Sequence, residues 1–300
     1  MKELVVISGK GGTGKTSVVA ALASLAGNAV LADCDVDAAD LHLVLEPTIV
    51  QRNDFIGGKR ARIVGDRCVA CGKCQATCRF GAISMTGPGN DVISKTYAVD
   101  RLACEGCGLC VGACPCDAVE FKPMVAGQWF ISETRCGPMA HARLGVAAEN
   151  SGKLVSLVRS AARDLAQEHG RPLVIVDGPP GIGCPVIASL TGADVALIVA
   201  EPTLSGLHDL QRVAELTRHF GIKTLLCVNK WDINPELAER IEQEALGCGL
   251  GVAGRLRYDA AVTAAQIRKL SVLEYAKDGV SQDITTAWAA VSAALELEKA

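Results

Sequence analysis

Short hydrophobic runs and helix-like patterns alternate at the start of the chain. The runs KELVVIS (2–8) and AVLADCD (29–35) are typical of buried strands. Between them, TSVVAALASLAG (16–27) repeats its apolar residues at helical spacing and stops at a glycine. The order strand, glycine-rich loop, helix, strand predicts the beginning of an α/β unit with a parallel sheet.

The same alternation fills the second half of the chain. Strands are expected at 127–132, 172–181, 193–202, 223–230 and 251–257. Helices are expected from about Leu144 to His169, at 206–221, from about Pro235, and in the amphipathic segment 281–300. Strands that alternate with helices predict an α/β fold with a doubly wound, mostly parallel sheet.

A different pattern interrupts this alternation at residues 59–122. Nine of the fourteen cysteines lie here, eight of them in two closely spaced runs, with glycines and short strand-like pieces between them. The segment CVACGKCQATC (68–78) matches CEGCGLCVGAC (104–114) at an offset of 104 − 68 = 36 residues, which predicts two copies of one supersecondary unit. We therefore expect a small α+β domain at 59–122, inserted into a discontinuous domain formed by 1–58 and 123–300.

Composition narrows the function classes. The net charge of −3 and the 4% of aromatic residues argue against a nucleic-acid surface, so no nucleic acid is expected as a partner. The glycine loop begins too early, at Gly9, for a secretory signal, and acidic residues and prolines break the longest apolar stretch. These features predict a cytoplasmic protein without a membrane anchor, whose cysteines indicate metal or redox chemistry rather than disulfides.

The segment GKGGTGKTS (9–17) follows the first strand and matches the phosphate-binding pattern G-x-x-x-x-G-K-[ST]. Its glycines let backbone N–H groups turn toward phosphates at a helix N-terminus. Lys15 is expected at the β- and γ-phosphates, and the Thr16 hydroxyl at Mg²⁺. The predicted nucleotide-binding residues of this loop are Gly9, Lys10, Gly11, Gly12, Thr13, Gly14, Lys15, Thr16 and Ser17.

A second lysine, Lys10, occupies the second position of this loop. With it the chain resembles the deviant Walker A ATPases, a group that includes the MinD-, ParA- and Mrp-type proteins and the relatives of the nitrogenase iron protein. The resemblance implies ATP, Mg²⁺ and a homodimer that forms on ATP binding, in which Lys10 reaches the partner's nucleotide as an arginine finger does. A solvated surface lysine is the alternative.

The resemblance also implies further members of the site. Asp35, after the second strand, corresponds to the switch I aspartate, although helix capping is another role for the carboxylates of this stretch. Asp177, after four apolar residues, corresponds to the Walker B aspartate that binds Mg²⁺ through water, and Gly181 to the switch II residue that senses the γ-phosphate. The expected catalytic residues are Lys10, Lys15, Asp35 and Asp177.

The segment VNKWD (228–232) leaves the identity of the base open. N-K-x-D is the guanine-reading motif of GTPases, because a carboxylate accepts from both the ring N–H and the exocyclic amine. In the deviant Walker A group an asparagine at this place contacts adenine. We expect Asn229 at the base in either case and favour ATP because of Lys10, and Asp232 is the residue on which the alternative, GTP, depends.

The two cysteine runs resemble the C-x₂-C-x₂-C-x₃-C run of bacterial ferredoxins. The resemblance implies two [4Fe–4S] clusters, in which the fourth cysteine of each run completes the other cluster. One cluster is expected on Cys68, Cys71, Cys74 and Cys114, and the other on Cys104, Cys107, Cys110 and Cys78. Zinc is the alternative metal, but it gives no reason for the third and fourth cysteine of each run.

Three cysteines near these motifs need separate consideration. Cys116, just after the last ligand of the second run, is expected to be a passive packed residue. Cys136, in the polar stretch SETRCGPMAHARLG, and Cys184, just past Gly181, are candidates for a further cluster that bridges two subunits. The alternative is that both are ordinary structural cysteines.

These features predict a dimeric ATPase whose nucleotide-driven conformational change is coupled to the two clusters. Its output would be electron transfer, or delivery of a cluster, to a redox or iron–sulfur acceptor protein. One alternative is an ATP-timed positioning or partitioning scaffold, in which the clusters are structural or redox-sensing. A GTPase is the other.

Overall fold

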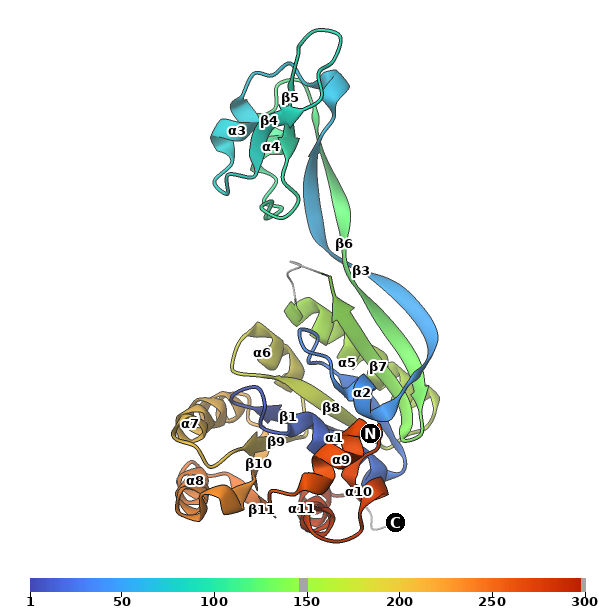
Figure 1. Cartoon of the computed structure of the whole chain (residues 1–300), viewed down its shortest axis with the longest axis vertical. Helices are drawn as coiled ribbons and strands as arrows, with labels where there is room; N and C mark the ends of the chain where they lie inside the picture. The colour runs from blue at the N-terminus through green and yellow to red at the C-terminus, as the bar shows by residue number, and fades with distance from the viewer. Residues whose placement is uncertain (146–150, 298–300) are drawn as a thin grey trace. The chain divides into compact units, whose positions relative to one another are not determined.

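A computed structural model describes residues 1–145 and 151–297, which form two compact units. The main unit comprises Met1–Asn53, Trp129–Leu144 and Ser151–Ala300, and the cysteine unit comprises Asp54–Gln128 and Gly145–Asn150. The chain passes from the main unit to the cysteine unit within one long strand and returns within another (Figure 1). The predicted insert, 59–122, lies wholly inside the cysteine unit.

One sheet of nine strands organises the main unit, in the order β11-β10-β9-β1-β8-β2-β7-β6-β3. The strands from β11 to β7 pair in parallel. Their bounds are β1 Lys2–Ser8, β2 Ala29–Asp33, β7 Gly137–Leu144, β8 Leu173–Pro180, β9 Val195–Ala200, β10 Lys223–Asn229 and β11 Gly251–Leu256. The two long strands that join the units are β3 Thr48–Ile63 and β6 Val119–Thr134. The predicted α/β fold with a mostly parallel sheet is confirmed.

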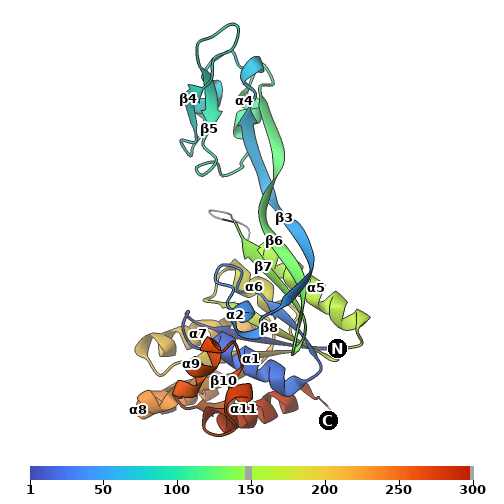
Figure 2. The same cartoon turned by 45° about the vertical axis from the view of Figure 1, so that its right-hand side comes forward.

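Helices cover both faces of this sheet (Figure 1, Figure 2). Leu4 and Val6 of β1 share a fully apolar core with one set of helices, and residues alternate between faces along a strand, so Val5 and Ile7 point to the other set. The helices of the first set are α1 Lys15–Ala26, α2 Leu41–Leu45, α9 Ala260–Ile267, α10 Val272–Tyr275 and α11 Val280–Leu295. Those on the opposite face are α5 Ser151–Glu168, α6 Cys184–Leu190, α7 Leu204–His219 and α8 Pro235–Gly247.

Two strands of the sheet, β3 and β7, were not predicted. The stretch that contains residues 137–144 carries a histidine and two arginines, which is typical of a polar segment, and the pattern predicts a helix from about Leu144. The structure has β7 there, and α5 begins at Ser151. The prediction was wrong because His141 is buried and satisfied: its ring nitrogen Nε2 lies 2.8 Å from the Ser132 hydroxyl, and its ring stacks on Phe130.

The cysteine unit shows the predicted repeat in its backbone. Helices α3 (Lys73–Thr77) and α4 (Leu109–Ala113) have the same length and lie 36 residues apart. Each follows a left-handed glycine, Gly72 at φ 76° and Gly108 at φ 77°. The unit's remaining elements are η1 Gly65–Arg67, β4 Ile83–Gly87 and β5 Thr96–Val99, the last two paired antiparallel.

Candidate functional site

The phosphate-binding loop lies between β1 and α1, at the carboxyl ends of the parallel strands. Because β1 is flanked by β8 and β9, the residues that follow these strands meet beside the loop, as expected at the carboxyl edge of an open α/β sheet. Gly12 and Gly14 take φ values of 83° and 84°, which L side chains rarely adopt. A Cβ on Gly14 would also lie 2.4 Å from the Asn229 amide nitrogen, so this position requires glycine.

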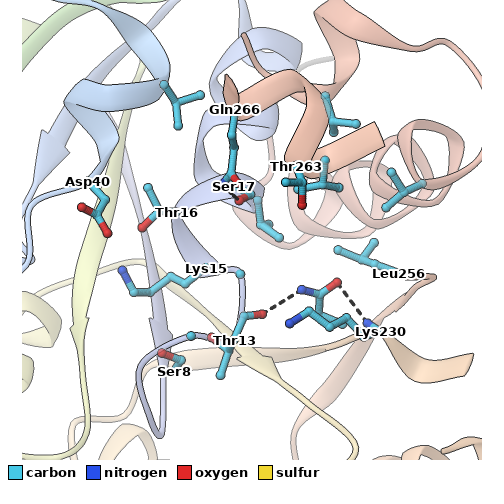
Figure 3. Close-up of a pocket in the computed structure, with 18 of the residues that line it drawn as sticks. Ser8, Thr13, Lys15, Thr16, Ser17, Asp40, Lys230, Leu256, Thr263 and Gln266 are labelled. Carbon is cyan, nitrogen blue, oxygen red and sulfur yellow. Dashed lines mark hydrogen bonds between the residues drawn. The ribbon is translucent and has the colours of Figure 1, made fainter. Parts of the chain in front are cut away.

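A cleft of about 720 Å³ opens over this loop. One wall is formed by Asp40, Leu43 and Val44 in and before α2, and another by Leu256 and the residues of α9. Figure 3 shows Lys15, Thr13 and Lys230 on one side of this space, and Thr263 and Gln266 of α9 on another. The cleft has the location and size of a small-molecule site.

Lys15 is buried at the base of the cleft and meets two carboxylates. Its ammonium donates to Oδ1 of Asp177 and lies 3.5 Å from Oδ2 of Asp35. Burial by itself lowers the pKa of Lys15, but attraction to Asp177 and Asp35 outweighs it, so the pKa is raised. The lysine is therefore a fixed positive charge where a nucleotide phosphate would lie.

The carboxylates after β2 have separate roles. Asp33 is fully buried and accepts the backbone N–H groups of Asp35 and Leu41, so it shapes the loop. Asp35 lines the cleft, and burial raises its pKa despite the neighbouring Lys15. Of the two, Asp35 is the one that faces the cleft.

The residues predicted to hold Mg²⁺ fit such an ion. Asp177 lies across from Asp33 in the pairing of β8 with β2, and its Oδ2 is buried without a hydrogen-bond partner among the described residues. A buried carboxylate oxygen is costly to leave unpaired, and an ion or its bound water would satisfy it. Thr16, which also lines the cleft, offers the hydroxyl oxygen that Mg²⁺ takes in phosphate-binding loops.

Lys10 contacts residues of its own chain. Its ammonium lies 3.5 Å from a carboxylate oxygen of Glu201 and donates to the hydroxyls of Thr203 and Ser205. Glu201 also accepts from Lys230 at 2.5 Å. The side chain is thus held beside the start of α7.

Three other predicted residues have defined partners. The Gly181 N–H donates to the Ser8 carbonyl at 2.9 Å, so here it is not directed at a phosphate. Asn229 donates to the Thr13 carbonyl at 2.7 Å, the bond that Figure 3 draws from Thr13. Asp232, within η2 (Trp231–Ile233), accepts the Tyr258 N–H at 2.7 Å and does not line the cleft.

Sequence patterns did not indicate that α9 forms one wall of the cleft, or that Arg135 holds the segment after α9 in place. Gln266 of α9 donates to the Ser17 hydroxyl at 2.8 Å (Figure 3). Arg135, in the turn between β6 and β7, donates to the Val44 and Leu45 carbonyls, to the Lys269 carbonyl and to Glu274. It thereby ties the end of α2 to the segment after α9. No motif marks either residue, because each acts through groups distant in sequence.

The cysteine unit contains a second, smaller cavity. Cys68, Cys71 and Cys74 from the first run line it together with Cys114 and Cys116 from the second. Four of these are the ligands predicted for one cluster. Burial, with Cys68, Cys114 and Cys71 as neighbours, raises the pKa of the Cys74 thiol.

The other four predicted ligands lie in the same unit. Burial, with Cys104 and Cys107 as neighbours, raises the pKa of the Cys110 thiol, and Cys78 packs in the same small core as Cys104 and Cys110. Within residues 1–145 and 151–297, no group of three or more His, Cys, Asp or Glu side chains is arranged to hold a metal ion.

The structure separates the two cysteines considered for a bridging cluster. Cys136 precedes β7, whose first residue, Gly137, lies against the carbonyl of Ala29 at the start of β2. Cys184 begins α6, beyond the end of β8. Since these strands are parallel, the thiols lie at opposite edges of the sheet. A single cluster formed by both is therefore ruled out.

None of the described helices is both long and apolar enough to span a bilayer.

Comparison with known proteins agrees with this geometry. The CobQ/CobB/MinD/ParA nucleotide binding domain matches residues 4–272. The uncharacterized protein MJ0578 of Methanocaldococcus jannaschii is 34% identical over 236 residues, which cover 77% of this chain and 79% of that protein. The uncharacterized ferredoxin MJ0722 of the same organism is 35% identical over 57 residues, 19% of this chain and 70% of that protein.

Solved structures share the fold at low sequence identity. The cell division ATPase MinD of Pyrococcus furiosus aligns with a TM-score of 0.57 at 17% identity, covering 97% of this chain and 98% of that one. The septum site-determining protein MinD of Pyrococcus horikoshii, complexed with Mg-ADP, has a TM-score of 0.57 at 16% identity, covering 97% and 95%. Together with the family match over most of its length, these findings place the chain in the CobQ/CobB/MinD/ParA family of nucleotide-binding P-loop proteins.

Proposed function

We propose that this protein is a Mg²⁺-dependent ATPase whose ATP-driven dimerisation controls two [4Fe–4S] clusters in the cysteine unit. The output is electron transfer, or delivery of a cluster, to an acceptor protein. The observation that carries the nucleotide half is the meeting of Lys15, Asp35 and Asp177 at the base of the cleft, with one oxygen of Asp177 unpartnered among the described residues.

Each residue of the cleft would have a separate role in binding or hydrolysing the nucleotide. Lys15 binds the β- and γ-phosphates, Thr16 and Asp177 hold Mg²⁺, and Asp35 orients the attacking water. The ion neutralises phosphate charge when bound. Gly181 contacts the γ-phosphate only after its N–H leaves the Ser8 carbonyl. That exchange links the phosphate loop to the segment after β8.

Lys10 would complete the site of a second copy. To reach the partner's nucleotide, its ammonium must leave Glu201, Thr203 and Ser205. The contacts here therefore correspond to the chain before dimerisation.

Support for ATP over GTP comes from the base-proximal residues. A guanine-reading carboxylate must face the base, whereas Asp232 does not line the cleft and its Oδ1 accepts from the Tyr258 N–H. Asn229, which borders the cleft, is the base contact in this proposal.

Support for the clusters comes from the spacing of the cysteines and from the cavity that joins the two runs. Three thiols at C-x₂-C-x₂-C spacing plus one remote cysteine are the ligand set of a cubane. In a cubane each thiolate binds a different iron, so the ligands surround a space rather than one ion. The 35% identity to the ferredoxin MJ0722 supports the same assignment.

The proposal is tested on anaerobically purified protein, reduced with dithionite and mixed with candidate acceptors with and without MgATP. We expect MgATP to change the rate of electron or cluster transfer. If both rates stay the same while MgATP alters the assembly state, the coupling is absent.

That outcome would favour the second candidate, a positioning scaffold. The observation that favours it is the shared fold with MinD, of which one structure is described as a cell division ATPase and another as a septum site-determining protein. Competition between ATP and GTP on the same sample tests a GTPase.

A further inference from the structure

A fifth thiol borders the cavity of the first predicted cluster. Cys116 lines it together with Cys68, Cys71, Cys74 and Cys114. A [4Fe–4S] cluster has four irons and takes four thiolates, so one of these five cysteines has no iron to bind. The spacing of the run assigns Cys114 as the ligand, which leaves Cys116.

Cys114 and Cys116 belong to one tight turn. The Ala118 N–H donates to the Cys114 sulfur at 3.3 Å, and Asp117 takes a left-handed φ of 48°. The two cysteines are two residues apart, and both line the cavity. Cys116 is therefore the one thiol at this cavity that is both unassigned and next to Cys114 in the chain.

The internal repeat supplies a natural comparison. At the offset of 36, Cys78 corresponds to Cys114 and Phe80 to Cys116, and the turn closes on left-handed Gly81 at φ 64° as it does on Asp117. Phe80 has no metal-binding atom and is 48% exposed. The two turns are alike, and only the second carries an additional thiol.

We propose that Cys116 is a reserve ligand for the cluster of Cys68, Cys71, Cys74 and Cys114, and that it takes over the iron of Cys114 when that bond is lost. This rests on the proposed presence of clusters. In the exchange the Cys116 thiol gives its proton to water and its thiolate binds the iron. The released Cys114 thiolate takes up a proton, and no electron is transferred. The other cluster, with Phe80 at the matching place, has no reserve.

The test compares Cys114→Ala with Cys78→Ala after anaerobic reconstitution. Alanine is used because a serine oxygen can itself bind iron. We expect wild type and Cys114→Ala to hold about eight irons, and Cys78→Ala to lose at least one. Oxidised Cys78→Ala should either show the paramagnetic signal of a three-iron cluster or lose that cluster entirely. Cys114→Ala should show neither result.

Two further variants sharpen the comparison. Cys114→Ala with Cys116→Ala should lose iron as Cys78→Ala does. Cys78→Ala with Phe80→Cys should regain it, because the reserve has been installed in the first turn. In native protein, iodoacetamide should alkylate Cys116 in wild type and leave it unmodified in Cys114→Ala.

The outcomes separate the two proposals. Wild type that holds no iron and sulfide overturns the clusters themselves. Wild type with about eight irons, but with Cys114→Ala as depleted as Cys78→Ala, overturns the reserve ligand alone. Equal alkylation of Cys116 in wild type and Cys114→Ala has the same meaning.

Discussion

The two units differ in what holds them together. The main unit has a large apolar core in which strand residues such as Leu4, Leu31 and Ile175 are fully buried against helices. The core of the cysteine unit has eight buried residues, and three of them are Cys68, Cys74 and Cys110. A core this small stabilises little by burial alone, and bound metal commonly supplies the difference. One chain thus combines a unit that folds through packing with one expected to depend on its metal.

Removal of iron is the largest perturbation that tests this contrast. We expect chelation under reducing conditions to abolish amide protection across Asp54–Gln128, because metal binding and folding are coupled there. Strands β1 and β8 should stay protected, because their residues are buried in the core of the main unit. Hydrogen exchange on the apo and reconstituted protein measures this. Retained protection of the cysteine unit in the apo form would contradict the contrast.

Substitutions of the two lysines of the phosphate loop should change nucleotide binding and turnover in the main unit and leave the iron content of the cysteine unit unchanged. Lys10→Ala is expected to lower ATP turnover by about 10³-fold with nucleotide binding largely intact, because it removes a charge that acts across the dimer. Lys15→Ala should weaken nucleotide binding as well. Steady-state hydrolysis and titration with a fluorescent nucleotide give both quantities, and iron content is the control. Unchanged turnover per subunit in Lys10→Ala would rule out its role across the dimer.

His141 should make the main unit sensitive to acid. Burial lowers its pKa from 6.5 to about 4, with a smaller contribution from His42. The unfolded chain then binds a proton that the folded chain does not, so stability falls as pH drops from about 6.5 toward 4. The loss at pH 5 is on the order of 2 kcal/mol. Urea unfolding at pH 7 and 5 should show a smaller decrease in His141→Gln than in wild type; equal decreases would contradict this.

Arg135, in the turn between β6 and β7, should give the smallest effect. Arg135→Ala is expected to lower the free energy of unfolding by about 1 kcal/mol. The ion pair with Glu274 is partly exposed and contributes little, but the hydrogen bonds to carbonyls are lost as well. Arg135→Lys is the matched control, because it keeps the positive charge but lacks the several N–H donors of the guanidinium group.

The pH dependence of that variant distinguishes its two kinds of partner. Burial tends to raise the pKa of Glu274, but hydrogen bonds from Arg135 and Ser271, together with the Arg135 charge, lower it overall. The ion pair therefore contributes stability above pH about 4.5, which is lost as pH falls through the lowered value. The difference between wild type and Arg135→Ala should shrink in acid, as measured by urea unfolding. A constant difference would assign the whole effect to the carbonyl contacts.

The sequence alone determined the strand–loop–helix beginning at β1 and α1, the doubly wound sheet and the repeat of cysteine runs. These depend on local pattern: hydrophobic period, glycines that a tight loop requires, and fixed spacing between ligands. The same rules missed β7, because a buried histidine that is paired with Ser132 looks polar in sequence.

Tertiary structure alone decided which distant groups meet. It brings Asp177 to Lys15 across 162 positions and Gln266 to Ser17 across 249, and it sets Cys136 and Cys184 at opposite edges of one sheet. It also turns Cys116 from a neighbour in sequence into a fifth thiol around a shared cavity. Such contacts follow from strand order and packing, which no local pattern encodes.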